Sequence, residues 1–503
     1  MTAILLKKVE TFRGILRRLS NLTSISNQLY WDMITFMPPE GIEQRALDVA
    51  MVSTDLFDLS VSPQMADCLD ALERPEAQAE LDDALRAAVR ECRRTYRLNA
   101  SIPTDLYEAF ATCKSQSEMA WQAAKRAGDF AHFAPYLTRM VDFQRQFVEL
   151  WGYEGHPYNA LLDQFEPGLT VSQFDGISAA LRAAITPLLS RIQAAGPRGL
   201  DVMRTAFPRQ GQERLGRWIL QEMGFDFDRG RLDESEHPMT CGSATYDVRM
   251  TTHYHATGLD AIFSCLHEGG HGLYMQGMDE GLNGTTLTDG ASCGMHESQS
   301  RFYENFIGRS LAFWRYAYPE AQRCFPDALG QVPLEDFYAG INRVQSNPIR
   351  IEADEVTYNL HIMLRYELEK RMLDGSLSVA DVRDAWRELS RDYLGLIPAD
   401  DRTGVLQDVH WAGDLMGYFP SYTMGNLYAA QFYEALCREA PDLEAQLARG
   451  NLGLVRDWLQ ERIHRFGKTK RPDDLLRDVT GKGLDPTALT RYFEGKYAAI
   501  YAI

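Results

Sequence analysis

Helical periodicity is the feature that most limits what this 503-residue chain can fold into. Apolar residues recur three and four positions apart, with charged residues between them, which is the pattern of amphipathic helices on a shared core. Stretches of this kind lie at 79–98, 104–126, 136–151, 172–195, 355–373, 378–393, 426–438 and 454–464. The one convincing strand is 243–252, where Tyr246, Val248 and Met250 alternate with polar residues, and two antiparallel strands before it would complete a sheet. The sequence therefore predicts a mainly α protein with one small β-sheet near its middle.

The sequence shows no internal boundary that would split the chain into separate domains. Length alone allows two to four domains of about 150 residues each. Turn-rich clusters such as 194–201 are only as long as loops, and the sequence holds no repeat and no low-complexity linker. We therefore predict a single domain over residues 1–503.

The charge balance excludes several classes of partner. Lys and Arg number 52 and Asp and Glu number 70, which gives a net charge of −18, and no basic run stands apart. Such a surface would repel a phosphate backbone, so nucleic acid is not an expected partner. The N-terminal residues lack the apolar core of a signal peptide, and no run of 18 apolar residues could span a membrane. Eight cysteines without a CxxC pair favour reduced thiols, so we expect a cytoplasmic protein that makes no membrane contact.

Histidines indicate where a metal could bind. Six of the 11 fall within residues 237–296, where random placement would put fewer than two. Within this window stands the motif His267-Glu268-Gly269-Gly270-His271. On a helix His267 and His271 lie about 40° apart, so both imidazoles can reach one ion. Glu268 is offset so that it can take a proton from water and pass it to a leaving amine, which predicts a zinc hydrolase; the alternative is two histidines that cap or pack a helix without metal.

The helix that carries this motif should run from about Leu259 to Gln276. It holds Gly269, Gly270 and Gly272, and each glycine inside a helix costs up to about 1 kcal/mol relative to alanine. Three of them indicate the close approach of another backbone or of a substrate; the alternative is a poor or shorter helix. The strand just before this helix would act as an edge strand that holds an extended peptide beside the metal.

A catalytic zinc site needs a third protein ligand and one open position. The metzincin extension requires glycine at 274 and histidine at 277, where this chain has Tyr274 and Gly277, so that class is excluded. We favour Glu297, which lies at the start of an amphipathic helix, because a glutamate from a second helix gives the His₂Glu set of thermolysin-like enzymes. His296 is the rival ligand, although its favoured role is to orient a neighbouring ligand. The other candidates in this stretch are Asp279, Glu280, Asp289 and Glu304.

Six short blocks carry a resemblance to a known family. In order they are His237-Pro238-Met239, Asp247-Val248-Arg249-Met250-Thr251, His267-Glu268-Gly269-Gly270-His271, His296-Glu297-Ser298-Gln299, Ile349-Arg350-Ile351-Glu352-Ala353-Asp354 and Gly404-Val405-Leu406-Gln407-Asp408-Val409-His410-Trp411. In these blocks the sequence resembles the M32 family of metallocarboxypeptidases, the carboxypeptidase Taq family. Only the first block differs from the family pattern, which usually has Phe where Met239 stands. Methionine is an adaptable apolar residue, so this difference affects local packing more than the assignment to the family.

The resemblance implies a fold and an activity. The fold would be one large helical catalytic body with a deep groove and a small β-sheet beside the HExxH helix, gluzincin-like and similar to angiotensin-converting enzyme and neurolysin. The activity would be the removal of single residues from the C-terminus of peptide substrates. The family uses one Zn²⁺ per chain, sometimes activated by Co²⁺, and its members are usually homodimers.

The resemblance also implies roles for residues outside the metal site. Arg350 would bind the terminal carboxylate of the substrate, because a guanidinium does this bidentately; by residue type alone a surface ion pair is favoured. Arg249 is the rival, but Asp247 shares its strand face, which favours a structural pair. His237 lies in the first block and is a further candidate for substrate binding.

His410 and Tyr422 resemble the late site residues of the family. We expect both to stabilise the developing oxyanion, with Tyr428 as a spare. Asp408 would orient His410 or a ligand histidine. His253 and His255, at the end of the strand, would orient a ligand or form a polar rim.

Two other functions stay open. One is a related oligoendopeptidase or dipeptidyl carboxypeptidase on the same scaffold. The other is a non-catalytic helical protein with structural zinc, against which Glu268 argues, because a structural site needs no base beside the metal.

Overall fold

The computed structural model describes residues 2–503, which are mostly helical and divide into two compact units. The first unit consists of the residues up to Ala100, Gly199–Ile341 and Tyr428–Leu484. The second consists of Ser101–Arg198, Asn342–Leu427 and Asp485–Ile503. A single domain over the whole chain stays a prediction. Within residues 2–503, no helix combines the length and the apolar character that a membrane span requires.

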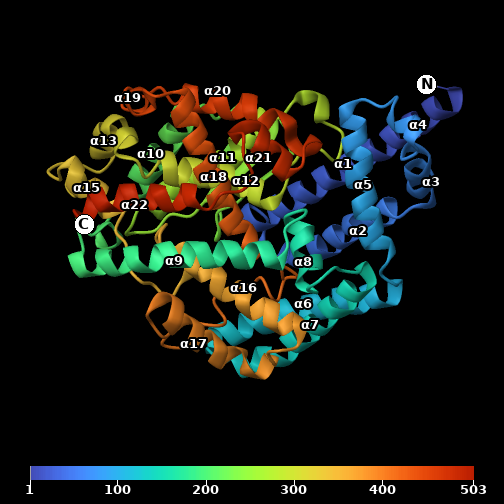
Figure 1. Cartoon of the computed structure of the whole chain (residues 1–503), viewed down its shortest axis with the longest axis horizontal. Coiled ribbons are helices and arrows are strands. Elements are labelled where there is room, and N and C mark those ends of the chain that lie inside the picture. Colours follow the sequence, from blue (N-terminus) through green and yellow to red (C-terminus); the bar gives the residue numbers. More distant parts are fainter. Residues whose placement is uncertain (1) are drawn as a thin grey trace. The chain divides into compact units, whose positions relative to one another are not determined.

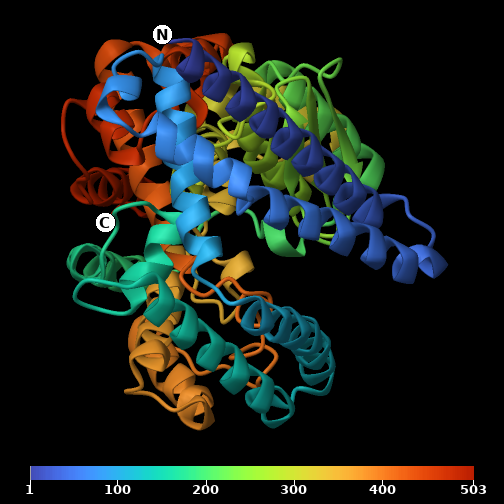
Figure 2. The same cartoon turned by 90° about the vertical axis from the view of Figure 1, so that its right-hand side faces the viewer.

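The first unit contains most of the helices and the sheet (Figure 1). Its helices are α1 (Ala3–Thr35), α2 (Ile42–Ser60), α3 (Pro63–Leu72), α4 (Pro75–Gln78), α5 (Asp83–Ala100), α10 (Arg209–Met223), α11 (Asp260–Gly277), α12 (Cys293–Arg301), α13 (Leu311–Cys324), α14 (Pro326–Leu329), α15 (Leu334–Ile341), α19 (Leu443–Leu447), α20 (Gly453–Arg462) and α21 (Pro472–Thr480). Short 3₁₀ turns and one π-helix connect them: η1 (Pro39–Gly41), η2 (Val202–Arg204), η3 (Glu280–Leu282), the π-helix η4 (Phe302–Ile307) and η7 (His464–Thr469). Figure 2 shows α1 and α2 side by side, an arrangement that buries Phe12, Leu16 and Leu59 in the core of this part of the unit.

The second unit contains helices and loops but no strand among its described residues. It contains α6 (Thr104–Ala127), α7 (Phe130–Trp151), α8 (Tyr158–Phe165), α9 (Val171–Ala195), η5 (Arg350–Glu352), α16 (Tyr358–Asp374), η6 (Val379–Asp381), α17 (Val382–Leu394) and α22 (Thr487–Tyr501). Helix α18 (Phe419–Glu439) begins in this unit and ends in the first. Gly128, in the left-handed conformation, ends α6 and allows α7 to turn back against it, while α9 lies beside α22 (Figure 1).

The predicted helices are confirmed, and the predicted strand needs correction. Each of the eight predicted helical stretches coincides with an observed helix. The strand predicted at 243–252 is two elements, β2 (Thr240–Ala244) and β3 (Asp247–Thr252), separated by a turn at 245–246. The turn interrupts the strand because Thr245 is buried and its N–H donates to Asn283 Oδ1 (3.1 Å) instead of to a neighbouring strand.

The sheet has the order β1-β3-β2, with β1 spanning Gly230–Glu234. Strand β2 pairs antiparallel with β3, as expected, but β1 pairs parallel with it, so the prediction of two antiparallel strands is wrong for β1. Val248 and Met250 on β3 are completely buried, and α11 packs against this strand. The mainly α fold with a small sheet beside the HExxH helix is confirmed.

The three glycines of α11 lie where neighbouring elements approach closely. A Cβ on Gly270 would come within 2.3 Å of the Gln299 carbonyl oxygen, in the backbone of α12. A Cβ on Gly269 would meet Leu220 of α10 at 2.6 Å, and one on Gly272 would meet Met250 of β3 at 2.9 Å. The predicted close approach of another backbone is therefore confirmed for Gly270, and the glycines let α11 sit tightly between α10, α12 and the sheet.

We expect Gly270→Ala to lower the free energy of unfolding by about 2–3 kcal/mol, because the added methyl group would force α11 and α12 apart. Urea unfolding followed by tryptophan fluorescence measures the effect. Gly14→Ala is the matched control: nothing lies within 4 Å of its Cβ position in α1, so alanine should stabilise the helix by up to about 1 kcal/mol. Equal unfolding of the Gly270 variant and the unsubstituted protein would contradict the close contact.

Candidate active site

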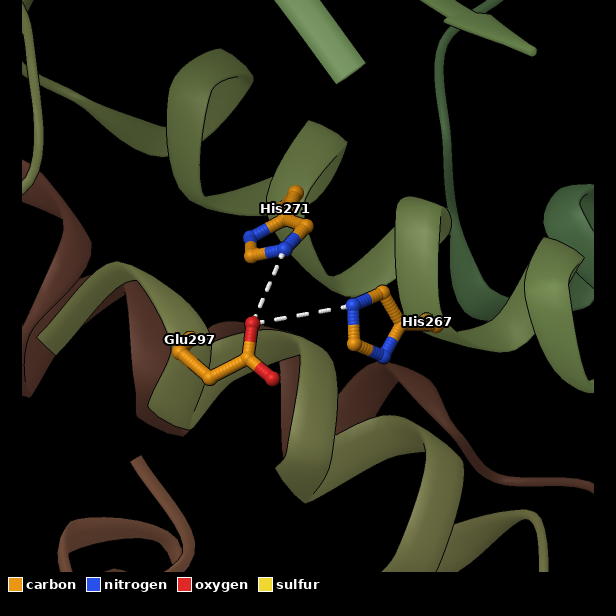
Figure 3. A group of neighbouring side chains, drawn as sticks. All are labelled: His267, His271 and Glu297. Atoms are coloured by element: carbon orange, nitrogen blue, oxygen red, sulfur yellow. Dashed lines mark ion pairs between the residues drawn. The ribbon is translucent and has the colours of Figure 1, made fainter. Parts of the chain in front are cut away.

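The two histidines of the HExxH motif and Glu297 form one cluster of ligand atoms in the first unit. Glu297 Oε2 lies 3.6 Å from His267 Nε2 and 3.5 Å from His271 Nε2. Figure 3 shows this carboxylate oxygen facing a nitrogen of each imidazole, with the histidines on α11 and the glutamate on α12. These three side chains are the only group of three or more potential metal ligands found among the described residues. They are also the three ligands that the sequence predicts.

Two features place α12 close to α11: a serine cap fixes where α12 begins, and a glycine of α11 leaves room for its backbone. Ser292 is the N-cap, and its hydroxyl accepts a hydrogen bond from the Met295 N–H. The backbone at Gln299, two residues beyond Glu297, then lies against Gly270. The π-helix η4 follows directly and widens the helical turn that carries Glu304.

The other nitrogen of each histidine is already occupied. His267 Nδ1 lies 2.8 Å from Glu304 Oε2, and His271 Nδ1 lies 2.6 Å from His296 Nδ1. A histidine whose Nδ1–H donates to a neighbour keeps the Nε2 lone pair for a metal. Glu304 and His296 therefore act here as partners of the two histidines instead of joining the ligand cluster.

Arg301 is a site residue that the sequence analysis missed. Its Nε donates to Glu297 Oε1 (2.7 Å) and its NH1 donates to Glu304 Oε2 (3.2 Å), so one guanidinium holds both carboxylates. Burial alone would raise the pKa of Glu304, but Arg301 and His267 lower it to about 2, and the pKa of Glu297 is also held well below its usual range. Both carboxylates are thus kept ionised. The i, i+4 spacing from Glu297 was the signal that could have identified Arg301.

Glu268 is buried next to the cluster and contacts the sheet. The Thr240 hydroxyl on β2 donates to Glu268 Oε2 at 2.6 Å. Burial raises the pKa of this carboxyl above its ordinary value. The strand that directly precedes α11 is β3, which lies in the centre of the sheet, so the predicted edge position is wrong for it. Strand β2 is an edge, although Asn27 of α1 already donates to its Gly242 carbonyl oxygen (2.7 Å).

The remaining ligand candidates lie in other interactions. Asp289 pairs with Lys468 Nζ at 2.6 Å, and Glu280 pairs with Arg229 at 3.4 Å. Asp279 caps the short turn η3 by accepting from the Gly281 N–H.

Arg350 and Asp408 form a buried pair in the second unit. Arg350 Nε and NH2 lie 3.0 and 2.9 Å from Asp408 Oδ1, and NH1 donates to the Tyr358 hydroxyl (3.0 Å). The guanidinium also lies over the Tyr422 ring, 4.9 Å from its centroid. Arg350 is therefore not the surface ion pair that residue type alone favours.

His410 and Tyr422 contact each other in the same unit. His410 Nε2 lies 3.3 Å from the Tyr422 hydroxyl, and its ring stacks on Phe419 at 4.3 Å. Burial lowers the pKa of His410 to about 3, so the imidazole is neutral at physiological pH. Tyr428 is buried in the part of α18 that belongs to the first unit.

Arg249 and Asp247 form the structural pair that their spacing favours. Arg249 Nε and NH2 donate to the two Asp247 oxygens at 2.8 and 3.0 Å, and the guanidinium lies over the Trp31 ring of α1 at 4.8 Å. His237 is exposed, and its carbonyl oxygen accepts from the Ser235 hydroxyl (2.6 Å).

The two histidines at the end of β3 contact each other and the backbone. His253 Nδ1 lies 2.9 Å from the Ser235 carbonyl oxygen, and its ring centroid is 4.6 Å from that of His255. His255 is exposed and His253 is half-buried. These contacts give no sign that either residue orients a metal ligand.

Comparison with known proteins identifies the family. The family model described as Carboxypeptidase Taq (M32) metallopeptidase matches residues 11–497. Carboxypeptidase 1 of Bacillus subtilis is 42% identical over 494 residues, which are 98% of this chain and 98% of that protein. Thermostable carboxypeptidase 1 of Thermus thermophilus is 40% identical over 497 residues, which are 96% of this chain and 97% of that protein.

Solved structures agree with the family model. The M32 carboxypeptidase from Deinococcus radiodurans R1 has a TM-score of 0.95 with 35% identity, over 99% of this chain and 100% of that one. The six ordered blocks, the His/His/Glu cluster and these matches over nearly the whole length of the chain point to the same conclusion. The chain is a metallocarboxypeptidase that belongs to the carboxypeptidase Taq (M32) metallopeptidase family.

Proposed function

We propose that this enzyme is a zinc-dependent carboxypeptidase that removes single residues from the C-terminus of peptides, with Glu268 as general base and then general acid. The observation that carries the proposal is the cluster of Glu297 Oε2 with two imidazole nitrogens, with a buried carboxylate next to it in sequence and in space. A purely structural metal site has no use for that additional carboxylate.

The donor set fits zinc. Two imidazole nitrogens and one carboxylate oxygen are the His₂Glu set of catalytic zinc sites. Ligand atoms about 2.0–2.2 Å from a tetrahedral ion lie roughly 3.3–3.6 Å apart, and the two distances to Glu297 Oε2 are 3.5 and 3.6 Å. A zinc ion held by His267, His271 and Glu297 would act as a Lewis acid and lower the pKa of water. We expect one ion per chain, with Co²⁺ able to replace Zn²⁺.

Glu268 has the environment of a proton carrier. Burial raises its pKa, which favours the protonated form once a proton has been taken from water. The Thr240 hydroxyl donates to Oε2 of this carboxylate, and we assign the proton transfer to Oε1. Glu268 then returns the proton to the nitrogen of the leaving amino acid.

Arg350 is suited to bind the free C-terminal carboxylate of a peptide. Three of its five N–H groups are used by Asp408 and Tyr358, and these bonds fix the plane of the guanidinium. A fixed guanidinium with two further N–H groups binds a carboxylate bidentately. The neutral His410 and the Tyr422 hydroxyl would stabilise the negative charge that develops during peptide hydrolysis.

Three further properties complete the proposal. We expect a homodimer because the sequence resembles the M32 family, and we expect a cytoplasmic location and no nucleic-acid partner because of the cysteine usage and the net charge. Peptides are the proposed substrates. Arg249, Asp247 and His237 stay candidates for binding them, but we rank them below Arg350 because Arg249 is paired with Asp247.

The test supplies one peptide with a free and with an amidated C-terminus. We expect about one zinc per chain, stepwise loss of single C-terminal residues from the free peptide, and a rate at least about 100-fold lower on the amide, because the amide removes the charge that Arg350 binds. Mass spectrometry of the products and metal analysis of the protein measure both quantities.

The other outcomes assign other functions. Internal cleavage of both peptides would identify an oligoendopeptidase and remove the proposed role of Arg350. Release of dipeptides from the free peptide would identify a dipeptidyl carboxypeptidase. Zinc without cleavage of either peptide would identify a structural metal site and contradict the proposal as a whole.

A further inference from the structure

A second buried arginine shares the carboxylate of Asp408. Arg365 Nε and NH2 lie 2.7 and 2.6 Å from Asp408 Oδ2, whereas Arg350 occupies Oδ1. The Arg365 side chain is completely buried, and its NH1 donates to the His361 carbonyl oxygen at 2.9 Å. Its guanidinium lies over the Trp386 ring, 4.7 Å from the centroid.

These three groups carry a surplus of one positive charge. Two guanidiniums and one carboxylate sum to +1, and the Asp408 side chain is only 10% exposed. Burial of an uncompensated charge is unfavourable, so a site that keeps one is suited to bind a counter-ion. Without Arg365, Arg350 and Asp408 would form a neutral pair with little attraction for an anion.

The neighbouring titratable groups do not cancel this surplus, and Lys125, which interacts with Asp408, adds positive charge. His361 and His410 are both buried, and burial lowers both pKa values well below the ordinary value, so neither imidazole adds a charge. Glu369 is a further buried carboxyl that interacts with Arg365, and burial raises its pKa to about 7, so at neutral pH it offsets only part of the surplus. Glu369 is also fully used by other donors, since it accepts from Trp411 Nε1 at 2.7 Å and from the Gly417 N–H at 2.9 Å.

We propose that Arg365 determines the preference of this enzyme for a free C-terminus, by supplying the positive charge that makes the Arg350–Asp408 pair attractive to a carboxylate. Arg365 reaches the substrate through Asp408 and Arg350 and is therefore a positioning residue. The inference rests on the proposed carboxypeptidase function. It adds a residue that lies outside every block of the family resemblance and that no spacing in the sequence indicates.

The test compares Arg365→Gln with Arg365→Lys on the free and the amidated peptide. Glutamine keeps hydrogen-bonding groups but removes the charge, and lysine keeps the charge. For Arg365→Gln we expect kcat/KM on the free peptide to fall about tenfold through KM, with little change on the amide, because one charge at roughly 10 Å changes binding by that factor. Arg365→Lys should stay within about threefold of the unsubstituted enzyme, and zinc content should be the same in all three proteins.

A second pair of variants guards against loss of folding. Arg365→Gln removes a cation that stabilises the buried carboxylate of Glu369, and this loss could destabilise the fold. The double variant Arg365→Gln/Glu369→Gln removes that carboxylate as well, and its Arg350–Asp408 pair still has no net charge. Glu369→Gln alone is its control, because it leaves the surplus at +1. The preference is the ratio of kcat/KM on the free peptide to kcat/KM on the amide. We expect this ratio to be about tenfold lower in the double variant than in Glu369→Gln.

The outcomes separate this inference from the function on which it rests. The charge role of Arg365 would be overturned if Arg365→Gln lowered kcat/KM equally on both peptides. It would also be overturned if Arg365→Lys lowered kcat/KM on the free peptide as much as Arg365→Gln does. If Arg350→Gln abolishes the preference while the Arg365 variants keep it, the inference fails and the proposed function stands. If the unsubstituted enzyme shows no preference for a free terminus, the proposed function itself fails.

Discussion

Glu268→Gln should lower kcat by about 10²–10⁴-fold, the usual contribution of a general acid–base group. Glutamine has nearly the same shape as glutamate and can accept the hydrogen bond from Thr240, but it can no longer take a proton from water. The three metal ligands are untouched, so the variant should keep about one metal per chain. Steady-state kinetics on the free peptide and metal analysis of the same sample measure both effects.

Glu280→Gln is the matched control for this substitution. Glu280 also lies in the first unit, but its side chain is 71% exposed and contacts only Arg229 at 3.4 Å. Activity within about twofold of the unsubstituted enzyme is expected there, because an exposed ion pair contributes little. Full activity of Glu268→Gln would exclude Glu268 as the base and would require another group to take the proton.

Glu297→Gln should weaken zinc binding by more than about 100-fold, which is the upper end of the effect for residues that only orient a ligand. The amide oxygen is a poorer ligand than the carboxylate, and the charge opposite the two imidazoles is lost. Loss of the metal should remove activity in proportion. Competition for zinc with a chelator of known affinity measures the change directly.

Glu304→Gln should weaken zinc binding less than Glu297→Gln does. Glu304 contacts His267 Nδ1 and not the ligand atoms, so zinc affinity should fall only about 10–100-fold. His296→Gln tests the rival ligand in the same way. If Glu297→Gln kept its metal while His296→Gln lost it, His296 would be the third ligand and Glu297 its partner.

The sequence predicts the cluster of His267, His271 and Glu297 well because its parts are local. His267 and His271 are four residues apart on one helix. Helix geometry alone sets the distance and angle between two such positions, independent of the rest of the fold. Glu297 lies on the nine-residue helix α12, and the glycines of α11 indicated that some backbone approaches closely, which Gly270 and α12 confirm. Side chains that arrive from distant segments carry no such signal. Thr240 and Arg365 are examples, since nothing in their own neighbourhood shows which carboxylate they meet.

The strands were harder to predict for the same reason. Alternation extends from Ser243 to Thr252 in the sequence, but the turn at 245–246 depends on Asn283, which is almost 40 residues away along the chain. The pair of Arg249 and Asp247 follows from their spacing of two residues on one strand. Trp31, which covers the Arg249 guanidinium, comes from a helix more than 200 residues earlier and could not be anticipated.

The order of the chain through the two units has a consequence for biosynthesis. Three separate segments build each unit, and the polypeptide passes from one unit to the other five times, so no single cut would release one complete unit. Helix α22, at the very end, lies beside α9, which a ribosome would have completed about 290 residues earlier. Contacts between such distant segments form slowly. Until they form, the apolar surfaces that they will bury are exposed to solvent and can aggregate. The core of the second unit, which contains Arg350 and Arg365, is therefore complete only after α22 has been synthesised. The first unit needs Tyr428–Leu484 in the same way, long after its metal-site helices α11 and α12 have formed.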